Sequence, residues 1–131
     1  MYDARQPDAL RGSPLRKSTL NIDLHPTLLE LCGVSMPEGT QGRSLVAQLK
    51  NEEHPGREMF FIEHHFPDQC FIPSSEAIRT DRWKYIRYTD NAAPFEELYD
   101  LQTDLHEVRN LARSPQHRRQ FQAMQQYCTR W

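Results

Sequence analysis

The chain has 131 residues, of which 16 are Lys or Arg and 18 are Asp or Glu, so its formal net charge is -2 with the two signs interspersed. This balance provides no basic surface for nucleic acid, and no apolar run approaches the roughly 18 residues of a membrane-spanning helix. The apolar fraction of 37% and the mean hydropathy of -0.81 are low for a self-sufficient globular domain, so part of the surface is expected to pack against a larger body or one end to be disordered.

The N-terminal part of the chain predicts an arm followed by a strand and a helix. Residues 1–17 carry prolines, basic residues and few apolar positions, which is typical of an extended or disordered arm. Two apolar residues alternate with polar neighbours over 18–23, which predicts a short strand. A helix is expected over 24–34, with Asp23 as its cap and Gly33 at its end. Leucines surround much of this helix, so we expect an apolar surface that needs a partner.

The middle of the chain predicts a turn-rich seam at 37–42, one helical turn over 44–49 and then a strand over 57–66. Alternation separates the side chains of this strand into two sets. One set is Phe60, Ile62, His64 and Phe66, and the other is Met59, Phe61, Glu63 and His65. Because both sets contain apolar residues, we expect this strand to lie inside the sheet.

Three further strands are predicted over 76–80, 83–88 and 95–101, the first two joined by a hairpin turn at 81–82. Connections of hairpin length favour antiparallel neighbours. The expected fold class is therefore α+β, with a small antiparallel sheet of about four strands and a C-terminal helix packed across it.

The C-terminal segment predicts a turn and then that helix. Asp104 and Glu107 have the spacing of a capping box. Ser114 is expected to cap the helix, and Pro115 suits its first position. Apolar residues recur at steps of three and four, which predicts a single stripe against the sheet. The stripe consists of Phe121, Met124, Cys128 and Trp131.

Five segments occur in one order along the chain: DLHPTLLELCGV at 23–34, QGRSL at 41–45, AIRTDRWKYI at 77–86, ELYDL at 97–101 and NLA at 110–112. Together they resemble the C-terminal part of a type I, formylglycine-dependent sulfatase of the alkaline-phosphatase-like superfamily. The resemblance covers about 18–131. It implies a division into the arm of 1–17, a strand-helix segment of 18–45 from the edge of a large α/β domain, and a C-terminal subdomain of 46–131.

The resemblance implies chemistry that this chain does not contain. Such sulfatases use a formylglycine made within a Cys-x-Pro-Ser-Arg type motif, and a calcium ion held by acidic residues. Here Pro73 follows Cys70 by three residues instead of two, no arginine comes next, and the aspartate cluster is missing. We therefore expect no catalytic and no metal-binding residue in this chain, which should be inactive alone. Calcium and formylglycine are expected in the remainder of the sulfatase, which is also the expected partner.

Metal binding from other residues is not expected either. Glu63 and His65 share a strand face and His54 lies nearby in sequence, but two candidate ligands fall short of the usual three or four. The three cysteines lack metal-ligand spacing, so we expect buried thiols. They are Cys32, Cys70 and Cys128.

The resemblance also implies that the C-terminal subdomain borders the active-site cleft. His64, His65 and Arg79 are therefore the candidate substrate-binding residues, which would contact a hydroxyl or an anionic group of a sulfated carbohydrate or an aryl sulfate. An alternative is that they contact only local carbonyls and carboxylates. The other strand cations are expected to pair with nearby acids. These are Arg82, Lys84 and Arg87.

Two other interpretations stay open at this point. A related phosphonate or phosphate monoester hydrolase can carry a similar tail, and an independent α+β binding module would share the same pattern of elements. Self-association through the apolar surface of Leu28 and Leu29 is a further expectation. The sequence leaves the compartment and the sulfate ester open, although a periplasmic or extracellular location would suit such a sulfatase.

Overall fold

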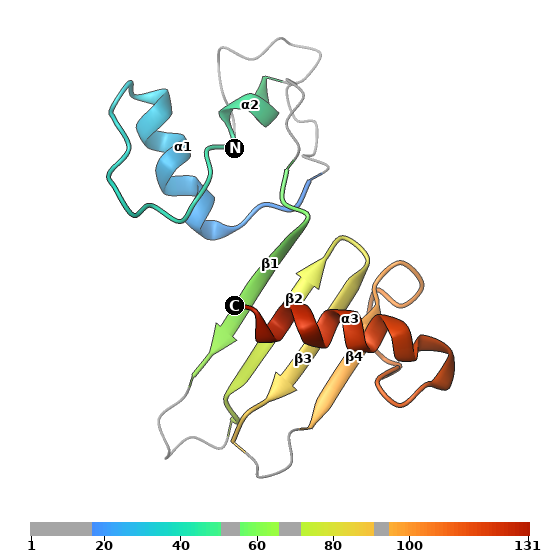
Figure 1. The fold of residues 1–131 in the computed structure, drawn as a ribbon. Coiled ribbons are helices and arrows are strands. Elements are labelled where there is room, and N and C mark those ends of the chain that lie inside the picture. The colour runs from blue at the N-terminus through green and yellow to red at the C-terminus, as the bar shows by residue number, and fades with distance from the viewer. Residues whose placement is uncertain (1–16, 51–55, 66–71, 91–94) are drawn as a thin grey trace. The chain divides into compact units, whose positions relative to one another are not determined.

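The computed structural model describes residues 17–50, 56–65, 72–90 and 95–131. The chain divides into two compact units, Met1–Arg57 and Glu58–Trp131 (Figure 1). Among the described residues, none of the helices has the length and apolar character needed to cross a bilayer. The division at residue 45 that the resemblance implies remains a prediction.

The first unit contains a 3₁₀ turn, η2 (Asn21–Asp23), the helix α1 (Leu24–Leu31) and the short helix α2 (Val46–Leu49). The strand predicted over 18–23 is wrong. The Asp23 carboxylate accepts the N–H of Leu20 at 2.9 Å, which closes a turn where an extended chain was expected. The helical turn predicted over 44–49 is confirmed by α2.

The end of α1 follows the prediction. Gly33 has a φ of 70°, a left-handed conformation that favours glycine. Its N–H donates to the carbonyl of Glu30 at 3.1 Å, and the N–H of Val34 donates to the carbonyl of Leu29 at 2.9 Å. This pair of bonds is the Schellman motif that ends many helices.

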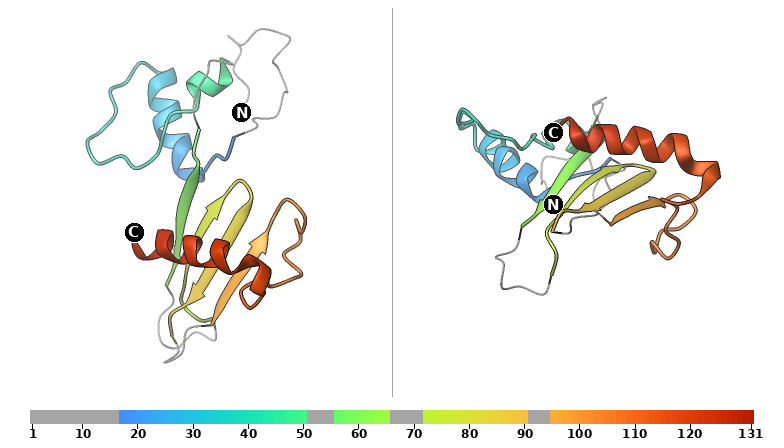
Figure 2. Two further views of the ribbon diagram at one scale, coloured as in Figure 1. Left: turned by 45° about the vertical axis from the view of Figure 1, so that its right-hand side comes forward. Right: turned by 60° about the horizontal axis from the view of Figure 1, so that its bottom comes forward.

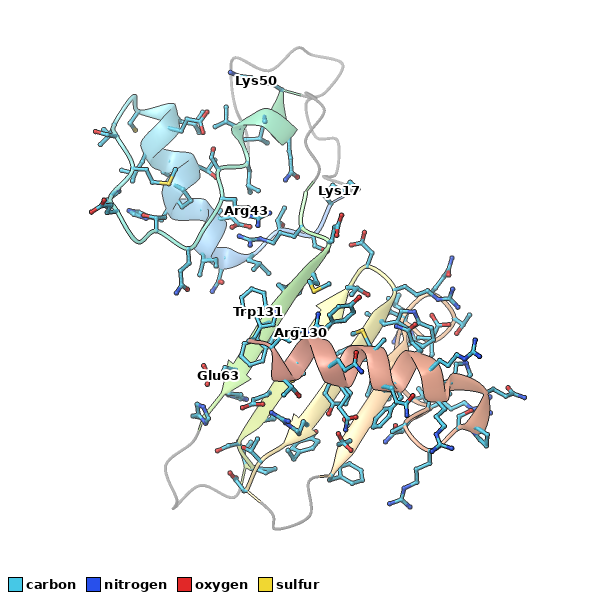
Figure 3. The ribbon with its side chains drawn as sticks, in the orientation of Figure 1. Lys17, Arg43, Lys50, Glu63, Arg130 and Trp131 are labelled. Atoms are coloured by element: carbon cyan, nitrogen blue, oxygen red, sulfur yellow. The ribbon has the colours of Figure 1, made fainter. Side chains whose placement is uncertain are left out.

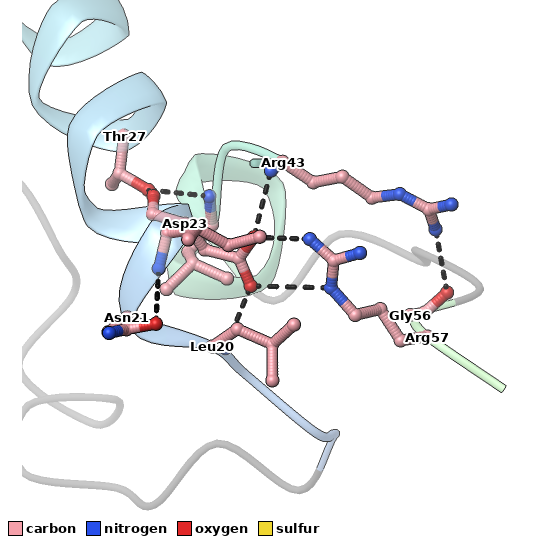
Figure 4. Close-up of polar contacts among 9 residues, drawn as sticks. Leu20, Asn21, Asp23, Thr27, Arg43, Gly56 and Arg57 are labelled. Atoms are coloured by element: carbon pink, nitrogen blue, oxygen red, sulfur yellow. Dashed lines mark hydrogen bonds and ion pairs between the residues drawn. The ribbon is translucent and has the colours of Figure 1, made fainter. Parts of the chain in front are cut away.

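Asp23 does not cap α1 as predicted, because its carboxylate joins three segments of the first unit (Figure 4). It accepts the N–H of Leu20 and the N–H of Arg43, each at 2.9 Å, and pairs with the guanidinium of Arg57. Burial opposes ionisation of this carboxyl, but these hydrogen bonds outweigh it and lower the pKa of Asp23. Asp23 is therefore a buried structural anion.

The segment after α1 returns onto the start of that helix. The hydroxyl of Thr27 accepts the N–H of Leu45 at 2.9 Å and donates to the carbonyl of Asp23. A Cβ atom on Gly42 would lie 2.0 Å from the carbonyl oxygen of Ile22, so a residue without a side chain is needed for this approach. The sequence segments at 23–34 and 41–45 thus form one packed structure.

The second unit is built on an antiparallel sheet of four strands in the order β1-β2-β3-β4, which confirms the predicted fold class. The strands are β1 (Met59–His64), β2 (Ser75–Thr80), β3 (Trp83–Tyr88) and β4 (Glu96–Asp100). The prediction that β1 lies inside the sheet is wrong, because the strand order places it at the edge. Apolar residues on both sides of a strand do not fix its position in the order of the sheet.

The helix α3 (Arg118–Thr129), preceded by η3 (Pro115–His117), lies across one face of this sheet (Figures 1 and 2). Beneath it, one residue from each strand forms a cross-strand row, and the predicted stripe supplies the buried Met124 and Cys128. The row is Phe61, Ile78, Tyr85 and Leu98. Trp131 stacks on Phe61 with a centroid separation of 6.0 Å, although 72% of Trp131 is exposed.

The predicted caps of the C-terminal segment are not formed as expected. Glu107 has a φ of 56°, which is outside a helix, and its carboxylate pairs with Lys84 at 2.6 Å instead of closing a capping box. The hydroxyl of Ser114 contacts the Nδ1 atom of His117 at 3.0 Å and makes no side-chain cap. Pro115 does open the helical segment as predicted.

Candidate functional site on the open face of the sheet

The face of the sheet opposite α3, here called the open face, carries three cross-strand rows of side chains. The strand register defines the first row as Phe60, Arg79, Lys84 and Tyr99, the centre row as Ile62, Ala77, Ile86 and Glu97, and the third row as His64, Ser75, Tyr88 and Phe95. The centre row is apolar across three strands. The first and third rows contain polar groups that can donate or accept hydrogen bonds.

The structure brings two of the three candidate residues onto this face. His64 lies opposite Ser75 in the third row, and Arg79 lies opposite Phe60 in the first row. Four residues along a strand separate these rows, which corresponds to about 13 Å between backbone positions. His64 and Arg79 therefore share a face but not a single point of contact.

His65 lies on the side of the sheet opposite the open face. It follows β1 on the side that Glu63 occupies, and its Nε2 atom lies 2.8 Å from Glu63 Oε1. Figure 3 shows Glu63 at the far end of β1, with Arg130 and Trp131 at the end of α3. Both His65 and Glu63 are exposed. The two adjacent histidines consequently cannot present their rings to one small ligand on the open face.

Two cations of β3 and one in the turn before it pair with acids, as predicted. Arg82 Nη2 lies 2.8 Å from Asp100, Lys84 pairs with Glu107, and Arg87 pairs with Glu76. The Arg82 hydrogen bonds lower the pKa of Asp100 despite its burial. Within the described ranges, Arg79 is a strand cation with no ion pair.

Sequence reasoning missed two tyrosines that share a carboxylate on the open face. Tyr88 donates its hydroxyl to Glu97 at 3.4 Å. Burial, together with the charge of Glu97, raises the pKa of Tyr99 to about 12, so both phenols are donors at neutral pH. Alternation places Glu97 and Tyr99 on one side of β4, and the register with β3 adds Tyr88 to the same face.

The described residues contain no set of three His, Cys, Asp or Glu side chains that converge as metal ligands. Cys70 and His54 lie outside the described residues. Cys32 is exposed, contrary to the prediction of buried thiols, and Cys128 is buried. Burial raises the pKa of the Cys128 thiol, which disfavours a reactive thiolate.

The family model described as "N-sulphoglucosamine sulphohydrolase, C-terminal" matches residues 5–130. Arylsulfatase K of Bos taurus is 33% identical over 100 residues, covering 70% of this chain and 18% of that protein. The N-acetylglucosamine-6-O-sulfatase of Bacteroides thetaiotaomicron is 30% identical over 112 residues, covering 82% of this chain and 20% of that protein. The chain thus spans about a fifth of the length of these relatives.

Solved structures share the fold. A protein solved in complex with its substrate D-glucosamine-2-N,6-O-disulfate superposes with a TM-score of 0.71 at 25% identity, covering 82% of this chain and 22% of the other. The phosphonate monoester hydrolase of Silicibacter pomeroyi gives a TM-score of 0.71 at 25% identity, covering 87% of this chain and 25% of the other.

Proposed function

Because the chain belongs to the family of N-sulphoglucosamine sulphohydrolase C-terminal domains, we propose that it completes a sulfatase and forms one wall of the pocket that binds the sulfate ester. The observation that carries this proposal is the extent of the likeness. Most of this chain aligns with about a fifth of N-acetylglucosamine-6-O-sulfatase. The other four-fifths of such a protein is then available for the chemical step.

The proposal assigns the nucleophile and the metal to that other part. When bound there, a formylglycine and a calcium ion would supply the attacking hydroxyl and the positive charge that hydrolysis of a sulfate ester needs. The residues described here do not fit a calcium site, because no three acidic side chains converge. This chain is therefore assigned a role in binding and orientation only.

A sulfated carbohydrate is the proposed substrate class. It is supported by the name of the Bacteroides relative and by the glucosamine disulfate bound in one solved neighbour. Arg79 would pair with an anionic group of the sugar, and His64 would hydrogen-bond a hydroxyl or a sulfate oxygen. The proposal leaves out His65, because its ring lies on the other side of the strand and its Nε2 atom already contacts Glu63.

A phosphonate monoester hydrolase is the second candidate. The neighbour from Silicibacter pomeroyi has the same TM-score, 0.71, as the protein bound to glucosamine disulfate. The fold of this chain alone is therefore compatible with both activities. The sequence relatives named above are sulfatases, which favours sulfate ester hydrolysis.

A chimera tests the proposed function. The C-terminal fifth of the Bacteroides N-acetylglucosamine-6-O-sulfatase is replaced by this chain, and turnover of a 6-O-sulfated glucosamine is compared with that of the same enzyme lacking its C-terminal fifth. We expect turnover by the chimera and none by the truncated enzyme. A folded chimera that binds the sugar no better than the truncated enzyme would contradict the proposal, as would a preference for phosphonate esters over sulfate esters.

A further inference from the structure

The C-terminal segment of residues 108–131 differs in charge from the rest of the chain. All 18 acidic residues lie in 1–107, so this segment contains arginines but no Asp or Glu. Its arginines are exposed and make no ion pair with another described residue. They are Arg109, Arg113, Arg118, Arg119 and Arg130. The segment that contains α3 is therefore positively charged, although the whole chain has a net charge of -2.

Two cavities adjoin along one side of α3. The first has a volume of about 510 Å³ and begins at Arg113, in the loop before the helix. The second has a volume of about 330 Å³ and extends to Arg130, which Figure 3 shows at the end of the helix. Gln125 lines both cavities, which together are here called the α3 groove. Residues at steps of three and four along one side of the helix form its wall. They are Arg118, Gln122, Gln125 and Thr129.

The α3 groove has cationic groups at both ends and neutral hydrogen-bonding groups between them. Arg113 and Arg118 line one end, and Arg130 lines the other. Guanidinium groups bind oxyanions through paired N–H donors. The side chains of Gln122 and Thr129 donate and accept hydrogen bonds, as sugar hydroxyls require. This arrangement suits a carbohydrate that carries several anionic groups.

The acids next to the groove do not cancel this charge. Arg87, which lines the second cavity, pairs with Glu76. Glu96 accepts hydrogen bonds from the hydroxyl of Tyr85 and, at 2.9 Å, from the side-chain amide of Gln125. Four arginines and two carboxylates therefore border the groove, so its net charge is positive.

The length of the groove indicates a chain and not a single sugar. Arg118 and Arg130 are separated along the helix axis by about 18 Å, at a rise of about 1.5 Å per residue. One sugar ring cannot reach both ends, whereas a polysaccharide can. Sites for single-stranded nucleic acid stack bases on exposed aromatic side chains. Among the described residues that line the two cavities, the only aromatic one is Phe121, which is half-buried against Tyr85.

We propose that the α3 groove binds a segment of a sulfated polysaccharide, with its arginines on sulfate groups and its glutamine side chains on hydroxyls. This inference rests on the proposed function for the chemical class of the ligand. The groove lies on the face of the sheet that α3 covers, whereas His64 and Arg79 lie on the open face. A polysaccharide held in the groove keeps its other sulfate esters at a high local concentration around the sulfatase.

The test measures binding of a fluorescent heparin octasaccharide to the 131-residue chain by anisotropy. Salt at about 0.1 M screens charges that lie more than about 10 Å apart. Arg113→Gln combined with Arg118→Gln removes two charges from the groove. The matched control combines Arg109→Gln with Arg119→Gln, at exposed positions that line neither cavity. We expect Kd to rise about tenfold in the groove variant and to stay within about twofold in the control. Gln122→Ala, which changes no charge, should raise Kd about threefold.

An equal rise in Kd in the two double variants would overturn the proposal, because binding would then depend on charge alone and not on the groove. Undetectable binding of the octasaccharide, or unchanged binding after its sulfate groups are removed, would also overturn it. Equally tight binding of a single-stranded DNA of the same charge would make nucleic acid the ligand. If the groove variant does not fold, Gln122→Ala decides, and an unchanged Kd in that variant contradicts the proposal.

This experiment separates the inference from the proposed function, because binding is measured on the chain without the chimera. Binding in the groove together with an inactive chimera would support the inference and contradict the proposed function. Turnover by the chimera without binding of the octasaccharide in the groove would do the reverse.

Discussion

His64 and Arg79 lie on the same face of the sheet at opposite ends of the β1–β2 pair, His64 opposite Ser75 and Arg79 opposite Phe60. The separation of about 13 Å between their backbone positions is too large for both side chains to bind one sulfate group closely. The two residues therefore make separable predictions.

Replacing each residue by alanine in the chimera tests its proposed contact with the sugar. His64→Ala and Arg79→Ala are each expected to lower kcat/KM by about tenfold or more, because a lost hydrogen bond to a charged group costs about 1.5–3 kcal/mol. Steady-state kinetics with a sulfated sugar checks this.

His65→Ala is the control for that experiment, since it changes an adjacent histidine whose ring lies on the other side of β1. Its kcat/KM should stay within about twofold of the parent chimera. A larger effect of His65→Ala than of the other two substitutions would contradict the assignment of the open face.

The buried pair of Asp23 and Arg57 predicts a local loss of stability on substitution. Asp23→Asn leaves the Arg57 charge without its partner, which should lower the free energy of local opening of the first unit by about 3 kcal/mol. Amide hydrogen exchange at Leu20, Arg43 and Leu45 measures this free energy of local opening. Glu30→Gln, at an exposed site of α1, removes the same charge and should change the exchange little.

The lowered pKa of Asp23 predicts how the stability of the first unit depends on pH. The pKa of Asp23 is lower in the folded chain than its ordinary value, which is about 3.9 in an unfolded chain. The stability that the Asp23 carboxylate contributes is therefore fully present above the pKa of the unfolded chain. It is lost as the pH falls through the pKa of the folded chain. Hydrogen exchange corrected for its intrinsic pH dependence should show less acid destabilisation in Asp23→Asn than in the parent chain. An equal acid response in the two proteins would contradict this.

The burial of Met124 predicts how much α3 contributes to the stability of the second unit. Its side chain is fully buried in the core cluster beneath the helix, so Met124→Ala should lower the free energy of unfolding by about 3 kcal/mol. Urea unfolding followed by the fluorescence of Trp83, which packs against this cluster, measures the change. Gln122→Ala, on the exposed side of α3, should stay within about 0.5 kcal/mol of the parent chain.

Much of the second unit was predictable because its signals are local. Alternation and the turn at 81–82 placed β2, β3 and β4 to within one residue at each end. Alternation also assigned His64 and His65 to opposite faces. It did not fix the position of β1 in the sheet, because apolar residues on two faces describe what covers the sheet, not the order of the strands.

Two of the errors occurred where a carboxylate has a partner that is distant in the sequence. Asp23 and Glu107 have the local spacing of helix caps, but their charges pair with Arg57 and Lys84. A carboxylate paired with a guanidinium or an ammonium group gains attraction between two full charges that a bond to a neutral backbone N–H lacks, so the distant partner prevails. The cluster of Tyr88, Glu97 and Tyr99 was missed for a related reason, since only the register between β3 and β4 brings it together.

An assay of the 131-residue chain alone, with an aryl sulfate and with calcium present or removed, tests the central claim most directly. The account predicts no turnover in either condition, because the chain supplies a wall of the pocket and the chemistry belongs to the rest of the sulfatase. Calcium-dependent turnover that disappears in Cys70→Ala would contradict it.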